Sequence, residues 1–149
     1  MDADVVAELR DRLRRHPADR QPLQHATAQF HLGGVLLADG ALDEAEAAFA
    51  EAAALFGARG ARPEQAKALN GLGATLRTAG RPGLAVRAFE HAAAGLAEAG
   101  LPLDEGAARC NLGVALREEG RAEDGAAELR RAVELLDPRE VPAQAAAAA

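Results

Sequence analysis

The chain repeats itself every 40 residues, and this periodicity limits the possible folds more than any other feature of the sequence. Each copy opens with a Leu-Gly pair, continues to a second glycine, and then carries a small residue, a Phe or Leu, and an Ala. Aligned without gaps, the three copies place these residues at Leu32, Leu72 and Leu112, Gly33, Gly73 and Gly113, Gly40, Gly80 and Gly120, Ala45, Ala85 and Gly125, Phe49, Phe89 and Leu129, and Ala52, Ala92 and Ala132. Periods of this length are typical of chains that stack copies of one supersecondary unit.

Each copy predicts a pair of helices. Leu32 and Leu36 lie four residues apart, as do their counterparts, which is the spacing of a buried helical stripe. Gly33 lies inside that helix, where glycine costs about 0.5–1 kcal/mol relative to alanine, so we expect a neighbouring helix to approach too closely for a side chain. Gly40 fits the left-handed residue that ends a helix. Pro63 and Pro82 suit first helical turns, and the Ala–Phe/Leu–Ala series marks the second helix.

This pattern resembles the tetratricopeptide repeat over about residues 22–138. The usual repeat has about 34 residues. The longer period here, with Ala68-Leu69-Asn70-Gly71-Leu72-Gly73, is more similar to the variant found in kinesin light chains and many bacterial regulators. The resemblance implies an all-α, right-handed superhelical solenoid of antiparallel helix hairpins, with about seven helices and a short C-terminal stub. The first helix lacks the family's large aromatic residue near its start, and Gly125 replaces a small alanine.

We expect one domain over residues 1–149. It divides into an N-terminal capping helix at 1–17, repeats at 22–60, 62–100 and 102–138, and an Ala-rich stub or tail at 139–149. In the capping helix, Val5, Leu9 and Leu13 keep the register of the second helices. The last segment resembles the opening of a fourth hairpin. It is either a stub helix over the last repeat or the start of further chain, and we favour the stub.

The resemblance also places a partner-binding groove on the first helices of the hairpins. The candidate contact residues in that groove are Phe30, His31, Lys67, Asn70, Arg77, Asn111 and Arg117, and the family's geometry turns Gly34, Ala38 and Gly71 toward it as well. Arg77 and Arg117 are one period apart, so we expect them roughly 10 Å apart, where arginine forks suit the capture of carboxylates. Asn70 and Asn111 suit hydrogen bonds to the backbone of an extended peptide. The alternative is that these are ordinary solvated side chains.

No set of side chains indicates catalysis or metal binding. His31 has no second histidine at helical spacing, and Cys110 is the only cysteine, which excludes an internal disulfide and a cysteine zinc cluster. We interpret both residues as structural. Adjacent acids such as Asp43 and Glu44 point about 100° apart on a helix and cannot converge on one substrate. We therefore predict no enzymatic activity, no cofactor and no metal.

Charge and hydropathy limit the partners. The net charge is −6 and no basic block is present, which argues against nucleic acid. No apolar run approaches the roughly 20 residues that span a bilayer. The start, Met1-Asp2-Ala3-Asp4, lacks the pattern of a signal peptide. We expect a cytoplasmic protein.

These features predict an interaction module, with an adaptor, regulatory or chaperone-like role, that binds a partner protein or an extended peptide of acidic or C-terminal character. The alternative is a structural protein that self-assembles, for example as a homodimer through the C-terminal end. A small-molecule binder or enzyme accessory is the third reading.

Overall fold

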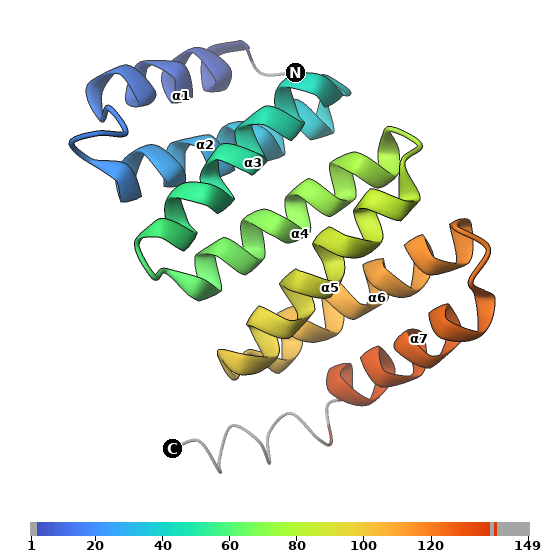
Figure 1. Cartoon of the computed structure of the whole chain (residues 1–149). Helices are drawn as coiled ribbons and strands as arrows, with labels where there is room; N and C mark the ends of the chain where they lie inside the picture. Colours follow the sequence, from blue (N-terminus) through green and yellow to red (C-terminus); the bar gives the residue numbers. More distant parts are fainter. Residues whose placement is uncertain (1–2, 138, 140–149) are drawn as a thin grey trace.

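The computed structural model describes residues 3–137 and residue 139. Within these residues the chain forms only α-helices: α1 (Ala3–Arg15), α2 (Pro22–Ala38), α3 (Leu42–Ala58), α4 (Arg62–Thr78), α5 (Pro82–Glu98), α6 (Pro102–Glu118) and α7 (Ala122–Leu136). Each helix packs on the next, and the hairpins stack side by side along one direction (Figure 1). The described residues thus confirm the predicted all-α solenoid of helix hairpins. Of the stub or tail that we predicted at 139–149, residues 140–149 lie outside the described part of the chain.

Glycines end five of the helices at regular intervals. Gly40, Gly60, Gly80, Gly100 and Gly120 have φ angles of 82°, 70°, 78°, 70° and 89°, in the left-handed region that glycine enters without a steric penalty. The next N–H then reaches back into the last turn, as where Ala41 N–H donates to Leu36 O at 2.9 Å. The prediction for Gly40 and its two 40-residue counterparts is confirmed. Gly60 and Gly100 end α3 and α5 in the same way.

The glycines inside the first helices face side chains of the second helices. A Cβ at Gly33 would lie 2.9 Å from Cγ of Phe49, and one at Gly73 would lie 2.6 Å from Cε1 of Phe89. A Cβ at Gly113 would meet Leu129 at 2.7 Å and the Gly125 carbonyl oxygen at 2.9 Å. The predicted close approach is therefore confirmed at all three positions.

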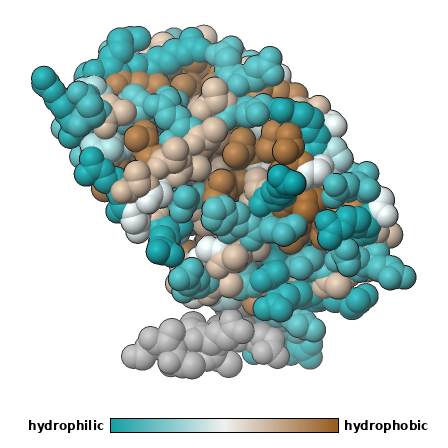
Figure 2. All heavy atoms as spheres, in the orientation of Figure 1, coloured by the Kyte–Doolittle hydropathy of each residue, from teal (hydrophilic) through white to brown (hydrophobic). Residues whose placement is uncertain are grey.

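The core is built largely from alanine because the helices pack closely. Four apolar clusters follow one another along the stack, and alanines such as Ala45, Ala52 and Ala92 have no exposed surface. At the N-terminal end, Leu9 of α1 lies in the first cluster and Leu13 packs against it, as the register predicted, but Val6 is buried with them in place of Val5, which is 40% exposed. On the face drawn in Figure 2, patches of apolar residues are surrounded by hydrophilic residues.

A partly buried ion-pair cluster ties α6 to α7. Arg109 Nε donates to Glu105 Oε2 at 2.7 Å and Arg109 Nη1 donates to Glu128 Oε2 at 2.9 Å. Burial lowers the pKa of Arg109, but its hydrogen bonds to the two glutamates and their charges outweigh this, so the pKa is raised above its ordinary value. The guanidinium therefore stays charged, as its partly buried carboxylate neighbours require.

Candidate partner-binding groove

The predicted groove residues lie on three helices. Phe30 and His31 are on α2, Lys67, Asn70 and Arg77 are on α4, and Asn111 and Arg117 are on α6. The structure brings four of them together, since Phe30, His31, Lys67 and Asn70 all line one open pocket of about 760 Å³ between α2 and α4. The pocket is further lined by Gly34, Val35, Ala38, Asp39, Phe49 and Gly71.

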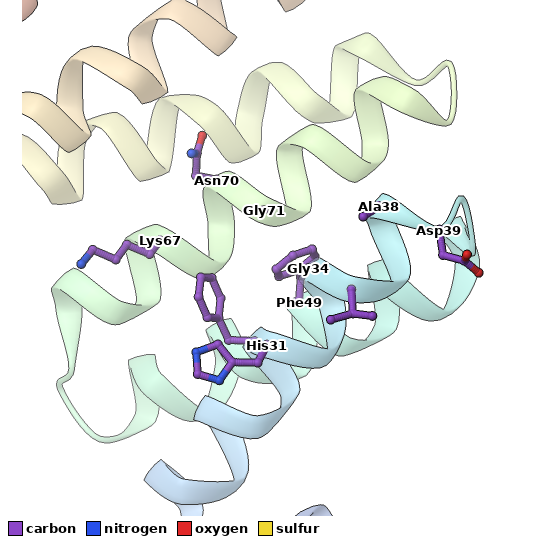
Figure 3. A pocket seen from close by; sticks show the side chains of 10 residues that line it. His31, Gly34, Ala38, Asp39, Phe49, Lys67, Asn70 and Gly71 are labelled. Carbon is purple, nitrogen blue, oxygen red and sulfur yellow. The ribbon is translucent and has the colours of Figure 1, made fainter. Parts of the chain in front are cut away.

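Aromatic rings form the wall and floor of this pocket. The ring of Phe30 packs edge-on against Phe49, with centroids 5.8 Å apart, and lies 5.7 Å from the ring of His31. Phe49 comes from α3 behind the groove and is only 3% exposed. Figure 3 shows Phe49 between α2 and α4, with His31 and Lys67 toward one end of the pocket and Ala38 and Asp39 toward the other. The sequence predicted Phe49 as core and did not place it at the groove.

Two glycines line this pocket, and their surroundings differ. Gly71 takes the place that His31 and Asn111 occupy in the other repeats, and a Cβ there would overlap the Phe49 ring, at 2.7 Å from Cδ1. Gly34 is the counterpart of Ala74 and Val114. A Cβ at Gly34 would have no heavy atom within 4 Å. This pair of glycines occurs at the junction between α2 and α4, whereas Ala74 and Asn111 stand at the same positions in the next junction.

Asn70 and Asn111 bridge the next two groove helices. Asn111 Nδ2 donates to Asn70 Oδ1 at 3.2 Å, and the pair is partly buried. Each side-chain amide carries two donor hydrogens and an acceptor oxygen with two lone pairs, so this bond leaves donors and acceptors that can face a ligand. The two residues are not at equivalent repeat positions, and the packing of α4 against α6 brings them together.

The three predicted groove cations differ in their surroundings. Arg77 Nε donates to Glu118 Oε1 at 3.0 Å, with side chains 37% and 41% exposed. Such exposed pairs contribute roughly 0–1 kcal/mol, but Glu118 offsets the Arg77 charge locally. Lys67 and Arg117 are exposed and make no side-chain hydrogen bond or ion pair within the described part of the chain. The structure therefore joins Arg77 to Glu118 and leaves Lys67 and Arg117 as the uncompensated cations.

Besides His31, the groove helices carry one histidine, His25, and one cysteine, Cys110. His25 bonds the His16 carbonyl oxygen at 2.8 Å and Glu51 at 3.1 Å, which ties α2 to its neighbours. Cys110 is half-buried on α6. Among residues 3–137 and 139, no group of three or more His, Cys, Asp or Glu side chains is arranged to hold a metal ion. Over the same residues, none of the helices combines the length and apolarity required to cross a bilayer.

Comparisons with known proteins agree with this architecture. The tetratricopeptide repeat family model matches residues 24–98, from α2 through α5, which includes the pocket. No curated protein matches the sequence. Among solved structures, the crystal structure of the TPR domain of Arabidopsis FLU is similar, with a TM-score of 0.72, 20% identity, and coverage of 76% of this chain and 96% of that chain. At that identity the likeness concerns the fold. Because the family model spans half of the sequence, the chain belongs to the tetratricopeptide repeat family.

Proposed function

We propose that this protein binds an extended, acidic segment of a partner protein in the groove formed by α2, α4 and α6. Tetratricopeptide repeats are protein-interaction modules, and the proposal adds the site and the chemistry of the ligand. The observation that carries it is the open pocket between α2 and α4, lined by groove residues and flanked by the uncompensated Lys67. An adaptor, regulatory or chaperone-like role in the cytoplasm belongs to the same proposal.

Charge supports an acidic ligand. The chain has a net charge of −6, yet the groove exposes Lys67 and Arg117 with no acidic side chain paired to them in the described residues. A carboxylate bound in the groove would be attracted by these two positive charges, and the guanidinium of Arg117 can bind it through two parallel hydrogen bonds. Either the C-terminal carboxylate or an acidic side chain of the partner segment would suit this arrangement.

The amide pair supports an extended backbone. Asn70 and Asn111 are held together by their hydrogen bond, so their remaining donors and acceptors are oriented before a ligand arrives. A backbone N–H and C=O of an extended peptide are suitable partners. Orientation in advance lowers the entropy lost on binding.

The experiment is selection of peptides from a displayed random library, followed by fluorescence anisotropy with the selected peptides. We expect Lys67→Glu/Arg117→Glu to weaken binding at least about tenfold, which corresponds to about 1.4 kcal/mol. The matched control is Arg59→Glu/Arg87→Glu, which makes the same charge change at exposed positions outside the groove, directly after α3 and on α5, and should alter affinity less than about twofold. Equal losses in the two double variants, or a selection that yields no binder, would contradict the proposal.

A second candidate function is self-association through the C-terminal end. Val133 of α7 is 68% exposed and Leu136 is 40% exposed, whereas the repeat equivalents Ala93 and Leu96 are each 1% exposed. In the earlier repeats the next hairpin covers these positions. Light scattering over a concentration series tests this reading. A dimer that becomes monomeric in Val133→Lys would favour it, and a monomer at all concentrations would exclude it.

A further inference from the structure

The space at Gly34 has no explanation in the packing of the fold. Glycine in a helix interior is destabilising relative to alanine, so a helical glycine calls for a reason. At Gly33, Gly73 and Gly113 the reason is steric, because a Cβ there would lie within 3.0 Å of a neighbouring side chain. At Gly34 a Cβ would meet nothing within 4 Å.

The other repeats confirm that a side chain is compatible with this position. Ala74 and Val114 occupy it in the second and third repeats, and both are half-buried. The fold therefore accepts alanine or valine there, and only in the first repeat is the position left empty. The empty position opens onto the pocket floored by Phe49, next to Gly71.

The pocket has the size and lining of an anchor site. Its volume of about 760 Å³ lies in the range of roughly 300–1,000 Å³ that encloses small ligands. Phe30, Phe49, Val35 and Ala38 supply apolar surface, and the polar groups of Lys67 and Asn70 come from α4. One large side chain of a bound segment would be surrounded by apolar groups on α2 and α3, while its backbone passes the polar groups of α4.

Resting on the proposed function, we propose that this pocket receives one bulky apolar side chain, aromatic or long aliphatic, from the bound segment, and that Gly34 keeps the pocket open for it. Lys67 meets an acidic residue adjacent to that anchor. The amide pair begins in the pocket wall at Asn70 and continues through its hydrogen bond to Asn111 on α6, so it meets the ligand backbone directly beside the anchor. The recognised sequence is then an apolar anchor flanked by acidic residues.

The test fills the pocket without disturbing the core. Gly34→Leu places a side chain in open space, and Gly34→Ala and Gly34→Val fill it less. For peptides selected on the wild-type chain, we expect Gly34→Ala to weaken binding least, Gly34→Val more, and Gly34→Leu most, by at least tenfold. Ala54→Leu, which adds the same kind of side chain at an exposed position of α3 outside the pocket, is the control and should bind within twofold of wild type. Thermal unfolding verifies that every variant is folded.

The peptides supply the complementary test. Replacing the apolar anchor residue of a selected peptide by Ala should weaken binding at least tenfold, and this loss should shrink when the chain carries Gly34→Leu. If the selected peptides bind but tolerate Gly34→Leu, or contain no apolar residue sensitive to Ala, the anchor inference is wrong and the proposed groove stands. If binding survives both pocket filling and Lys67→Glu/Arg117→Glu, the proposed groove is wrong as well.

Discussion

Two adjacent glycines in α2 should respond oppositely to the same substitution. Gly33→Ala and Gly34→Ala each replace a helical glycine, a change that favours the helix by about 0.8–1.0 kcal/mol. At Gly34 the new methyl group would have no atom within 4 Å, so the whole gain should appear as stability. We expect Gly34→Ala to raise the free energy of unfolding by about 1 kcal/mol and the melting temperature by about 3–4 °C.

At Gly33 the same methyl group meets the core. It would lie 2.9–3.0 Å from three ring atoms of Phe49, Cγ, Cδ1 and Cδ2. The ring has little room to move, because it also fills the space at Gly71 on α4. Overpacking of this kind costs about 1–3 kcal/mol, which exceeds the gain in helix propensity. We expect Gly33→Ala to lower the free energy of unfolding by about 1 kcal/mol, so that the two variants differ by about 2 kcal/mol.

The assay is urea unfolding followed by far-UV circular dichroism, with thermal unfolding as a second measure. The two substitutions are chemically identical and lie at adjacent positions of one helix, so their effects on the unfolded chain largely cancel when the two variants are compared. Equal stabilisation by the two substitutions would refute the view that Gly33 exists to admit Phe49. Destabilisation by Gly34→Ala would refute the claim that its space is empty, and with it the steric basis of the pocket-filling experiment.

Three further predictions concern the fold. Arg109→Leu should lower the free energy of unfolding by about 3 kcal/mol, because it leaves the buried Glu105 without its cation. Adding Glu105→Gln should recover much of the loss, because repeat two carries Gln65 and Leu69 at the same positions. An Arg109→Leu variant as stable as wild type would contradict this prediction. Since the pKa of Arg109 is raised in the folded chain, the stability that its positive charge contributes is fully present below the ordinary pKa of arginine and is lost only in stronger base. The Arg109 contribution to the free energy of unfolding should therefore be constant between about pH 6 and 9 when measured by urea unfolding. Gly80→Ala should cost about 1–2 kcal/mol in the same titrations, because its φ of 78° is strained for any residue with a Cβ, and a neutral result would contradict the left-handed assignment.

The repeat pattern predicted those features that each repeat shares. Gly33 inside the first helix and Gly40 at its end recur in each copy. Glycine inside a helix indicates the close approach of a neighbouring helix, and glycine just after a helix indicates a left-handed backbone conformation. Gly60 and Gly100 carry the same signal as Gly40. They were missed because the alignment followed the 40-residue period, whereas helices begin every 20 residues between α2 and α7.

Features that join different helices at unlike positions could not be predicted in this way. Arg77 and Glu118 are 41 positions apart, as are Asn70 and Asn111. The family resemblance indicated that Arg77, Asn70 and Asn111 face the groove, but the partner of each depends on how α4 is rotated against α6. The role of Phe49 was hidden for a related reason. A buried aromatic residue was predictable, but its ring lines the groove only because Gly71 on another helix leaves it uncovered.

Phe49 thus belongs both to the repeated core and to the groove, and a matched pair of substitutions separates the two roles. Repeat three carries Leu129 at this position, so Phe49→Leu and Phe89→Leu are both compatible with the fold. Phe49 is 3% exposed and Phe89 is 0% exposed, so each loss of packing should cost a similar amount, about 1–2 kcal/mol. Only Phe49 lines the pocket of about 760 Å³. Phe49→Leu should therefore weaken or redirect peptide binding in fluorescence anisotropy, while Phe89→Leu leaves it within about twofold. If both variants lose stability and affinity in parallel, binding follows the stability of the whole stack, and the pocket has no particular role in recognition.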